Sequence, residues 1–228
     1  GLSTHGMVVF RNKVRTKYKT RPLFLFCFLV LAGLFAFNSY ADEVTIDWKS
    51  GTYTGEVTDG VPNGEGIWKV LGVGWYSGGF KNGELHGTGI QEYVDRTRYA
   101  GEYKNNTRSG QGWFMFGSGD FKGTSFIGEF KNDEENGSGT FFWSDGEKYV
   151  GEFKDSYFHG QGELTYPDGY KYEGEWKYGQ FTGIGTYTSP DGEKYVGGWK
   201  NFEFHGWGKH TLTNGIKYDG GFKRGERN

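Results

Sequence analysis

The stretch that decides the fold is Tyr149-Val150-Gly151-Glu152-Phe153, because the chain repeats its pattern along nearly its whole length. The pattern is an aromatic residue, any residue, glycine, then glutamate or glycine, and a second aromatic residue. Its central glycines stand at positions 55, 78, 101, 128, 151, 174, 197 and 220. Every step between them is 23 residues, except the step of 27 residues from 101 to 128. A fixed period of this size is typical of a repeat protein.

Each repeat is predicted to form two strands. In the run from Tyr149 to Lys154, side chains alternate between two faces, and Tyr149, Gly151 and Phe153 share one face. A Gly-x-Gly motif follows, here Gly160 to Gly162, and it opens a second alternating run. Dipeptides such as Asp168-Gly169 between repeats favour tight turns with positive φ. The sequence therefore predicts an all-β, antiparallel meander of repeated hairpins.

The turn inside each repeat has its own signature. The residue five positions past the central glycine is usually Gly, Asn or Asp, which tolerate the left-handed region. Phe202 breaks this rule, so its loop is expected to differ or to be strained. These positions are Gly60, Gly83, Asn106, Asp133, Ser156, Gly179, Phe202 and Gly225.

A single sheet has no second layer to cover its apolar face. We expect the large rings of one strand to lie across glycines of the next strand, which have no side chain in the way. Stability would then come largely from contacts between neighbouring repeats. Because each repeat advances the sheet by about 10 Å, seven repeats would make an elongated single-layer structure of about 70 Å.

The N-terminal residues 1–41 predict a signal peptide with a hydrophobic helix. A basic run from Arg11 to Arg21 precedes an uncharged segment, Leu23 to Phe37, and the small residues Ser39 and Ala41 follow. Fifteen apolar residues span about 22 Å as a helix, less than the roughly 30 Å of a bilayer core. We expect export to the periplasm or the outside, leaving residues 42–228 as the repeat domain. The alternative is an uncleaved anchor that tethers the protein through residues 23–40.

Removal of residues 1–41 makes the chain acidic. Six Lys and Arg residues and no acid leave with this segment, so 20 of the 26 basic residues remain against 28 acids, a formal charge of −8. Such a charge disfavours nucleic acids and anionic phospholipids as partners. The single cysteine, Cys27, lies in the same segment, so the repeat domain has no disulfide or thiol chemistry.

The repeat resembles the MORN repeat (membrane occupation and recognition nexus), whose pattern reads Tyr-x-Gly-Glu-Phe/Trp-x-x-Gly-x-x-His-Gly-x-Gly and then an Asp-Gly turn. The resemblance covers about residues 51–226, as seven repeats and a C-terminal half-repeat. Val57 in place of an aromatic residue and the insertion at residues 117–123 depart from the pattern. The insertion is expected to lengthen the turn between the third and fourth repeats. The resemblance implies a protein-binding scaffold and a homodimer, with phospholipid contact in some members.

No residue set in the repeats points to catalysis, a metal or a cofactor. His86, His159 and His205 share one repeat position but would lie about 20 Å or more apart, too far to bind one metal. Glu56, Glu102, Glu129, Glu152 and Glu175 form a row with lysines nearby, which is interpreted as a solvated ladder of opposite charges. The Gly-x-Gly motifs have no strand-to-helix context for phosphate binding. We therefore expect a protein that is not an enzyme and has no cofactor.

The aromatic columns are the remaining candidates for a binding site. We expect some ring edges to stay accessible and to form a repeated groove for an extended peptide, a partner helix or a sugar chain. The sugar chain supports a further alternative, a polysaccharide-binding surface protein. The candidate groove residues are Tyr149, Phe153, Tyr172, Trp176, Tyr195 and Trp199.

Overall fold

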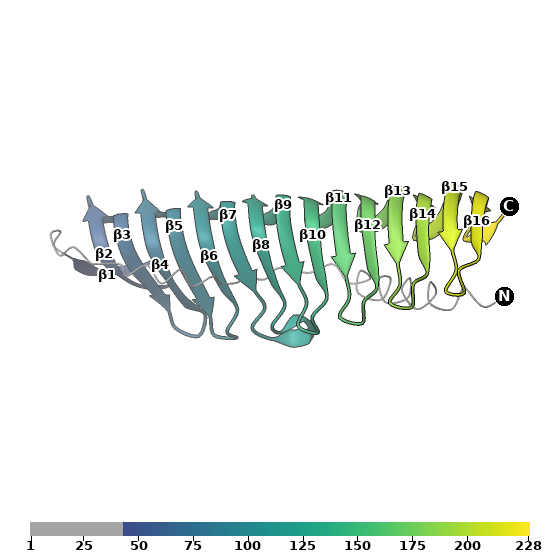
Figure 1. Cartoon of the computed structure of the whole chain (residues 1–228). Helices are drawn as coiled ribbons and strands as arrows, with labels where there is room; N and C mark the ends of the chain where they lie inside the picture. The colour runs from purple at the N-terminus through teal and green to yellow at the C-terminus, as the bar shows by residue number, and fades with distance from the viewer. Residues whose placement is uncertain (1–42) are drawn as a thin grey trace. The chain divides into compact units, whose positions relative to one another are not determined.

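A computed structural model of the protein describes residues 43–228. Over these residues the fold is all-β, with 17 strands in an antiparallel sheet and one short 3-10 helix (Figure 1). The predicted all-β class and the repeated hairpins are confirmed. The predicted signal helix in residues 1–41 lies outside the described residues. No helix within residues 43–228 is long and apolar enough to cross a membrane.

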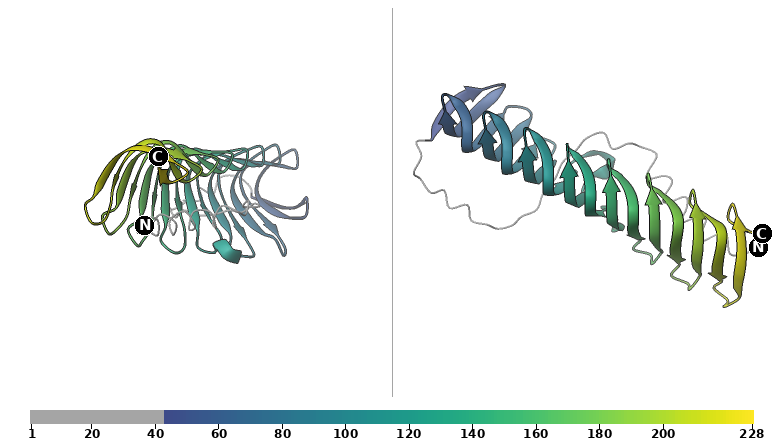
Figure 2. Two further views of the ribbon diagram at one scale, coloured as in Figure 1. Left: turned by 90° about the vertical axis from the view of Figure 1, so that its right-hand side faces the viewer. Right: turned by 90° about the horizontal axis from the view of Figure 1, so that it is seen from above.

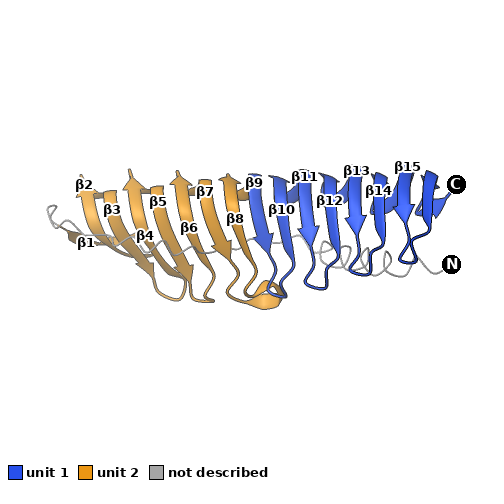
Figure 3. Ribbon diagram, in the orientation of Figure 1, with its two compact units in different colours: residues 1–23, 137–228 blue, residues 24–136 orange. Residues whose placement is uncertain are grey.

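The described chain divides into two compact units, which Figure 3 colours separately. Unit 2 ends at Asn136 and unit 1 resumes at Gly137, so the boundary falls within strand β9 (Glu134–Phe142). The strands of unit 2 are β1 (Val44–Trp48), β2 (Gly51–Thr58), β3 (Val61–Val70), β4 (Gly74–Lys81), β5 (Glu84–Tyr93), β6 (Arg98–Lys104), β7 (Thr107–Met115) and β8 (Ser125–Lys131). Those of unit 1 after β9 are β10 (Lys148–Lys154), β11 (Tyr157–Thr165), β12 (Lys171–Lys177), β13 (Gln180–Thr188), β14 (Lys194–Lys200), β15 (Glu203–Thr211), β16 (Lys217–Lys223) and β17 (Glu226–Arg227).

Within each unit, every strand pairs with the strands next to it in sequence, and Figure 2 shows the hairpins following one another. The register brings the repeat glycines opposite one another on consecutive strands. In unit 1 this row of cross-strand partners is Gly139, Gly151, Gly162, Gly174, Gly185, Gly197, Gly208 and Gly220. In unit 2 it is Gly55, Gly66, Gly78, Gly89, Gly101, Gly112 and Gly128.

Tyrosine rings lie over these glycine rows, as predicted. A Cβ placed on Gly162 would stand 2.2 Å from the hydroxyl of Tyr149 and 2.5 Å from its ring carbons. Gly185 and Gly208 are covered in the same way by Tyr172 and Tyr195. Only glycine leaves room for the ring. The tyrosine ring therefore packs directly on the backbone of the facing glycine.

Further aromatic residues complete the core on the same face. In unit 1 the ring of Tyr149 stacks on Phe158 at 3.7 Å and meets Phe153 and Trp176 edge-on at 5.2 and 5.1 Å. Trp176 comes from the next repeat, so each repeat covers the rings of its neighbour. The core is therefore built by neighbouring repeats, as predicted.

The turns inside the repeats all have positive φ at the predicted position, from 62° at Ser156 to 83° at Gly225. The residue before it is also left-handed, for example Asp155 with φ 50°. Two such residues in succession make the type I′ turn that suits the twist of a hairpin. Phe202 adopts the same conformation, with φ 66°, so its loop does not differ in backbone geometry. Its strain, as a bulky left-handed residue, is as predicted.

The insertion lengthens the turn between β7 and β8, as expected, and it contains the 3-10 helix Gly119–Phe121. The Oδ2 atom of Asp95, in the turn between β5 and β6, accepts hydrogen bonds from Ser118 and Thr97 at 2.8 and 2.9 Å. Burial opposes ionisation of Asp95, but these hydrogen bonds and those from backbone N–H groups outweigh it and lower its pKa. The insertion is therefore tied to a neighbouring turn of unit 2.

Candidate binding surfaces

The six residues predicted to line a groove all lie in the aromatic core of unit 1. Their exposed fractions run from 0% at Tyr149 to 5% at Phe153. The expected accessible ring edges are therefore absent at these side chains, because rings of the neighbouring repeats cover them. A role of these residues in binding a ligand stays a prediction. The six are Tyr149, Phe153, Tyr172, Trp176, Tyr195 and Trp199.

The tyrosine hydroxyls donate hydrogen bonds to backbone carbonyls of their own repeat. Tyr149 donates a hydrogen bond of 3.0 Å to the carbonyl of Glu152, where the pairing of β10 with β11 is shifted by a bulge. Tyr53 and Tyr195 make the equivalent bonds three residues along their own strands. Burial raises the pKa of Tyr195 to about 12, and burial together with nearby carboxylates raises that of Tyr53 to about 12. These phenols stay neutral and structural at ordinary pH.

Glutamates of the row bind backbone N–H groups of their own hairpins, where the sequence predicted a ladder of pairs with lysines. Oε1 of Glu152 accepts a hydrogen bond of 2.8 Å from the backbone N–H of Gln161, nine residues on. Glu102 and Glu175 bind the N–H of the equivalent residues at 2.7 and 2.9 Å. The sequence did not predict these bonds, which arise because the bulge leaves a backbone donor that a carboxylate at this position can reach.

The glutamates also influence one another at the start of the repeats. Burial and the charge of Glu56 raise the pKa of Glu65 above its usual value. Both residues lie in unit 2 and belong to the face opposite the aromatic core, because they alternate with Gly55 and Gly66 along β2 and β3. This part of the face therefore carries a concentrated negative charge.

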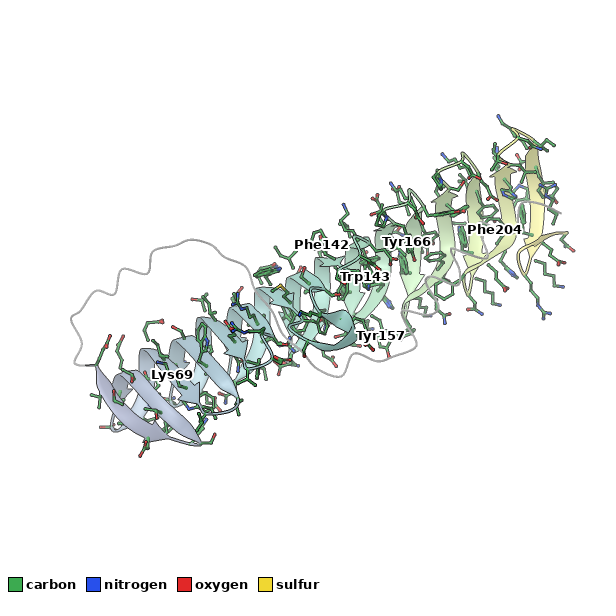
Figure 4. All side chains as sticks on the ribbon, turned by 90° about the horizontal axis from the view of Figure 1, so that it is seen from below. Lys69, Phe142, Trp143, Tyr157, Tyr166 and Phe204 are labelled. Atoms are coloured by element: carbon green, nitrogen blue, oxygen red, sulfur yellow. The ribbon has the colours of Figure 1, made fainter. Side chains whose placement is uncertain are left out.

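The repeat histidines lie next to the turns inside their repeats. The ring of His159 contacts that of Tyr178 edge-on at 5.4 Å, as expected for a loop-packing residue. Tyr178 in turn contacts Tyr157, which is labelled in Figure 4, at 6.0 Å. Among residues 43–228 there is no group of three or more side chains able to hold a metal ion.

An exposed row of lysines runs beside the same turns. These lysines stand two positions after the glutamate or glycine of the repeat and share its face. The members are Lys81, Lys104 and Lys131 in unit 2 and Lys154, Lys177, Lys200 and Lys223 in unit 1. Their spacing repeats every two strands, which is about 10 Å within a unit.

The face of unit 1 opposite the core carries large exposed apolar side chains. Trp207 is 71% exposed and Ile184 is 62% exposed, and each lies opposite a glycine, Gly221 and Gly198 respectively. The indole N–H of Trp207 donates to Asp219 at 3.2 Å. A hollow of about 230 Å³ lies near the turns of the same unit, lined by Lys177, Tyr178, Gln180, Phe181, Thr182 and Asn201.

Sequence reasoning missed a buried arginine in the core of unit 2. Arg108 is 2% exposed and stands where other repeats have Phe158, Phe181 or Phe204. Its Nε atom lies 3.0 Å from Oδ1 of Asp133, and its guanidinium lies over the ring of Phe130 among others. The signal was present, because the position seven residues past the central glycines is apolar in most of the full repeats, and Arg108 and Glu135 are the exceptions.

A second buried pair of polar side chains lies in unit 1. Nε2 of His210 and Oε1 of Glu193 are 2.6 Å apart, and both side chains are nearly inaccessible. His210 occupies a core position that Tyr187 and Leu164 fill in the two preceding repeats. The pair is enclosed by rings, including Phe204 at 5.2 Å, which Figure 4 labels.

The family model of the MORN repeat matches the chain six times, at residues 53–69, 76–98, 99–121, 126–148, 149–169 and 172–194. The chain belongs to the MORN-repeat family. The matches cover more than half of the sequence and follow the hairpins described above. The resemblance drawn from the repeat pattern is thereby confirmed.

Solved structures similar to this MORN-repeat chain include the wild-type TCP10 domain of Danio rerio CPAP. That structure has a TM-score of 0.36 and 12% identity and covers 78% of this chain and 85% of its own. The same domain in complex with a peptide of Danio rerio STIL has a TM-score of 0.32 and 14% identity, with coverage of 79% and 99%. A search of curated proteins found no match.

Proposed function

We propose that this chain is an exported, non-catalytic MORN-repeat protein that binds other proteins and acts as a scaffold. The supporting observation is the different use of the two faces within each unit. One face is filled by the aromatic core, whereas the other carries large exposed apolar side chains such as Trp207 and Ile184. The equivalent residue in the preceding repeat is Gln161, so the fold itself does not require an apolar residue there.

Export is supported by the order of the N-terminal residues, with a basic run, an apolar segment and small residues before Asp42. N-terminal sequencing of the protein recovered from its native compartment tests this step. A new terminus at Asp42 is expected. If segment 23–40 is still present, the protein is tethered to the membrane and is not released as a free protein.

Crosslinking in the native compartment, followed by reciprocal capture of the identified partner, tests the binding function. We expect a defined partner that also captures this chain, or self-association measured by sedimentation. Binding should weaken in a Trp207→Gln/Ile184→Gln variant. Glutamine is chosen because it is the natural residue at the equivalent position, Gln161. Failure to find any protein partner or self-association would refute the proposal.

The exposed lysine row supports a second candidate function, contact with anionic membranes. The acidic charge of residues 42–228 opposes it, because most of the surface would repel such lipids. Flotation with vesicles containing anionic phospholipid distinguishes the two functions. Binding that high salt abolishes, and that Lys154→Gln/Lys177→Gln weakens, would establish the membrane function.

A further inference from the structure

The face of unit 2 opposite the aromatic core carries a line of small and apolar side chains, one per strand from β3 to β8. They are direct cross-strand partners in turn, as the register of five successive strand pairs gives. We call this line the apolar row. Its members are Ile67, Ser77, Ile90, Ala100, Trp113 and Ile127.

The repeat does not require these residues. The equivalent positions in unit 1 include the cross-strand pair Glu163 and Glu173, both bound by Lys171 at 2.7 and 3.2 Å. Lys209 and Asp219 form another charged pair further along. A position that accepts Glu, Lys and Asp in some repeats has no structural need for Ile or Trp in others.

Side-chain size alternates along the apolar row from Ile67 to Trp113. The large residues Ile67, Ile90 and Trp113 are separated by the small residues Ser77 and Ala100. Neighbouring strands are about 4.8 Å apart, so the two hollows at the small residues are about 10 Å apart. Seven residues of an α-helix rise about 10.5 Å, so side chains at heptad spacing match these hollows.

The two sides of the apolar row differ in charge. Glu65 and Glu102 lie two residues along their strands from the row, about 7 Å away on the same face. Glu56, on β2 beside the end of the row, accepts a hydrogen bond of 3.2 Å from the Glu65 N–H through its Oε1. On the other side, Arg98 and Glu92 neutralise each other through an ion pair of 3.0 Å, and Lys69, labelled in Figure 4, precedes them. The lysine row lies beyond the glutamates at about 14 Å, outside the radius of about 5–6 Å of a helix centred on the apolar row.

We propose that the apolar row of unit 2 binds an amphipathic α-helix of a partner protein, with Lys or Arg along the flank that meets the glutamates. The row from β3 to β8 spans about 24 Å, the length of about 16 helical residues. The helix inserts apolar side chains at heptad positions into the hollows at Ser77 and Ala100. This inference rests on the proposed protein-binding function and names the class of partner.

The test uses a synthetic helical peptide of about 18 residues, with leucines at heptad spacing and lysines along one flank. The affinity of this peptide for the protein purified from its native cells is measured by fluorescence anisotropy at several salt concentrations. A peptide of the same composition in scrambled order should bind at least tenfold more weakly. Equal binding of the two peptides would overturn the proposal.

Two variants test the shape of the apolar row. Ile90→Thr/Trp113→Thr removes the ridges without changing charge, and threonine is the natural residue at Thr140 and Thr186, so the fold should persist. We expect at least a tenfold loss of peptide affinity. Ala100→Val fills one hollow while making the surface more apolar, as Val150 and Val196 do naturally. It should still weaken binding severalfold, whereas non-specific hydrophobic binding would become stronger or stay unchanged.

Matched variants locate the site and its charge. Val150→Thr/Val196→Thr makes a similar change in unit 1 and should leave the affinity unchanged. Glu102→Gln keeps an oxygen for the Gln111 N–H but removes the charge, so it should weaken binding and its salt dependence.

Peptide binding that persists in all the apolar-row variants would overturn the helix site while leaving the proposed function intact. Self-association that Ile90→Thr/Trp113→Thr abolishes would also overturn it, because a second copy would then occupy the row. Absence of any protein partner would instead remove the proposed function itself.

Discussion

At the scale of single residues, the first tyrosine of the repeat contributes a ring and a hydroxyl with separate roles. The ring of Tyr149 covers Gly162, and its hydroxyl binds the carbonyl of Glu152 beside the bulge. Repeat four has Phe126 at this position and therefore has the ring without the hydroxyl. The chain thus contains a natural comparison for the two contributions.

We expect Tyr149→Phe to lower the free energy of unfolding by about 1 kcal/mol, because a bulge carbonyl loses its donor while the packing is kept. Chemical unfolding followed by tryptophan fluorescence measures this change. Phe126→Tyr is the reverse control and should not destabilise the protein. A loss above about 3 kcal/mol for Tyr149→Phe would show that the ring has also moved.

The glycines of the row are expected to tolerate no side chain under a ring. Gly162→Ala should cost about 2 kcal/mol or more, because its Cβ would overlap the buried Tyr149 ring and the strand would have to shift. Gly221→Ala is the control, since its Cβ would have no neighbour closer than 3.6 Å. Its effect should stay within about 0.5 kcal/mol by the same unfolding measurement. Equal effects of the two variants would refute the ring-over-glycine account.

At the scale of the hairpin, the turn at Phe202 sets backbone strain against burial. Phe202 is left-handed, yet its ring is 5% exposed and packs on Phe181 at 5.0 Å. Phe202→Gly relieves about 1 kcal/mol of strain but loses about 3 kcal/mol or more of packing. We therefore expect a net destabilisation of about 2 kcal/mol in thermal or chemical unfolding.

Gly179 occupies the same turn position in the preceding repeat and provides the control. Gly179→Ala adds left-handed strain with no compensating ring and should cost about 1 kcal/mol. If Phe202→Gly stabilises the protein instead, the ring contributes less than the strain it imposes.

The hairpin β6–β7 contains the buried Arg108, at a position where other repeats have phenylalanine. Arg108→Phe with Asp133→Asn reproduces the neighbouring arrangement, in which Asn106 Oδ1 accepts the N–H of the apolar Leu85 at 2.9 Å. Exchanging a buried ion pair for packed apolar groups is often neutral or stabilising by about 1–4 kcal/mol. We expect the double variant to be at least as stable as the parent in urea unfolding.

Arg108→Ala is the contrasting variant and should lose about 3 kcal/mol or more, because it leaves Asp133 without its buried partner and opens a cavity. A double variant as unstable as Arg108→Ala would show that the guanidinium is required for the fold of unit 2.

The predictable part of this structure depends on period and residue type. The strands, the left-handed turn positions and the rings over glycines follow from Tyr149, Gly151 and their repeats, because each property is local to one or two strands. The role of Glu152 did not follow, because it depends on a bulge that brings a backbone N–H nine residues away within reach. The burial of the six candidate rings also depends on contacts from adjacent repeats. Arg108 was visible, with Glu135, as an exception at its repeat position, but its pairing with Asp133 depends on how two repeats pack.

At the scale of the whole molecule, the buried tyrosines predict loss of stability at alkaline pH. The pKa of Tyr53 and that of Tyr195 are raised to about 12, against about 10 in an unfolded chain. The folded state therefore keeps protons that the unfolded state loses, so stability is full below about pH 10 and falls as the pH rises toward 12. Each such tyrosine should remove about 1 kcal/mol at pH 11, after allowance for solvent screening.

Urea unfolding at pH 8, 10 and 11, with tyrosinate absorbance as a second signal, measures this loss. In a Tyr195→Phe variant, stability should fall less steeply between pH 9 and 11 than in the parent. A parent whose stability is the same at pH 8 and pH 11 would contradict the assigned shifts.

The pairing of each strand with its immediate neighbours in sequence has a consequence for how the chain folds. Antiparallel sheets commonly fold slowly because distant segments must meet, but within each unit here the contact order stays low. Any hairpin can act as the nucleus, and the sheet can then grow from it in either direction. Duplication or loss of a whole 23-residue repeat within a unit should therefore leave the folding rate nearly constant, a freedom that lets such a chain change length during evolution without becoming a slower folder.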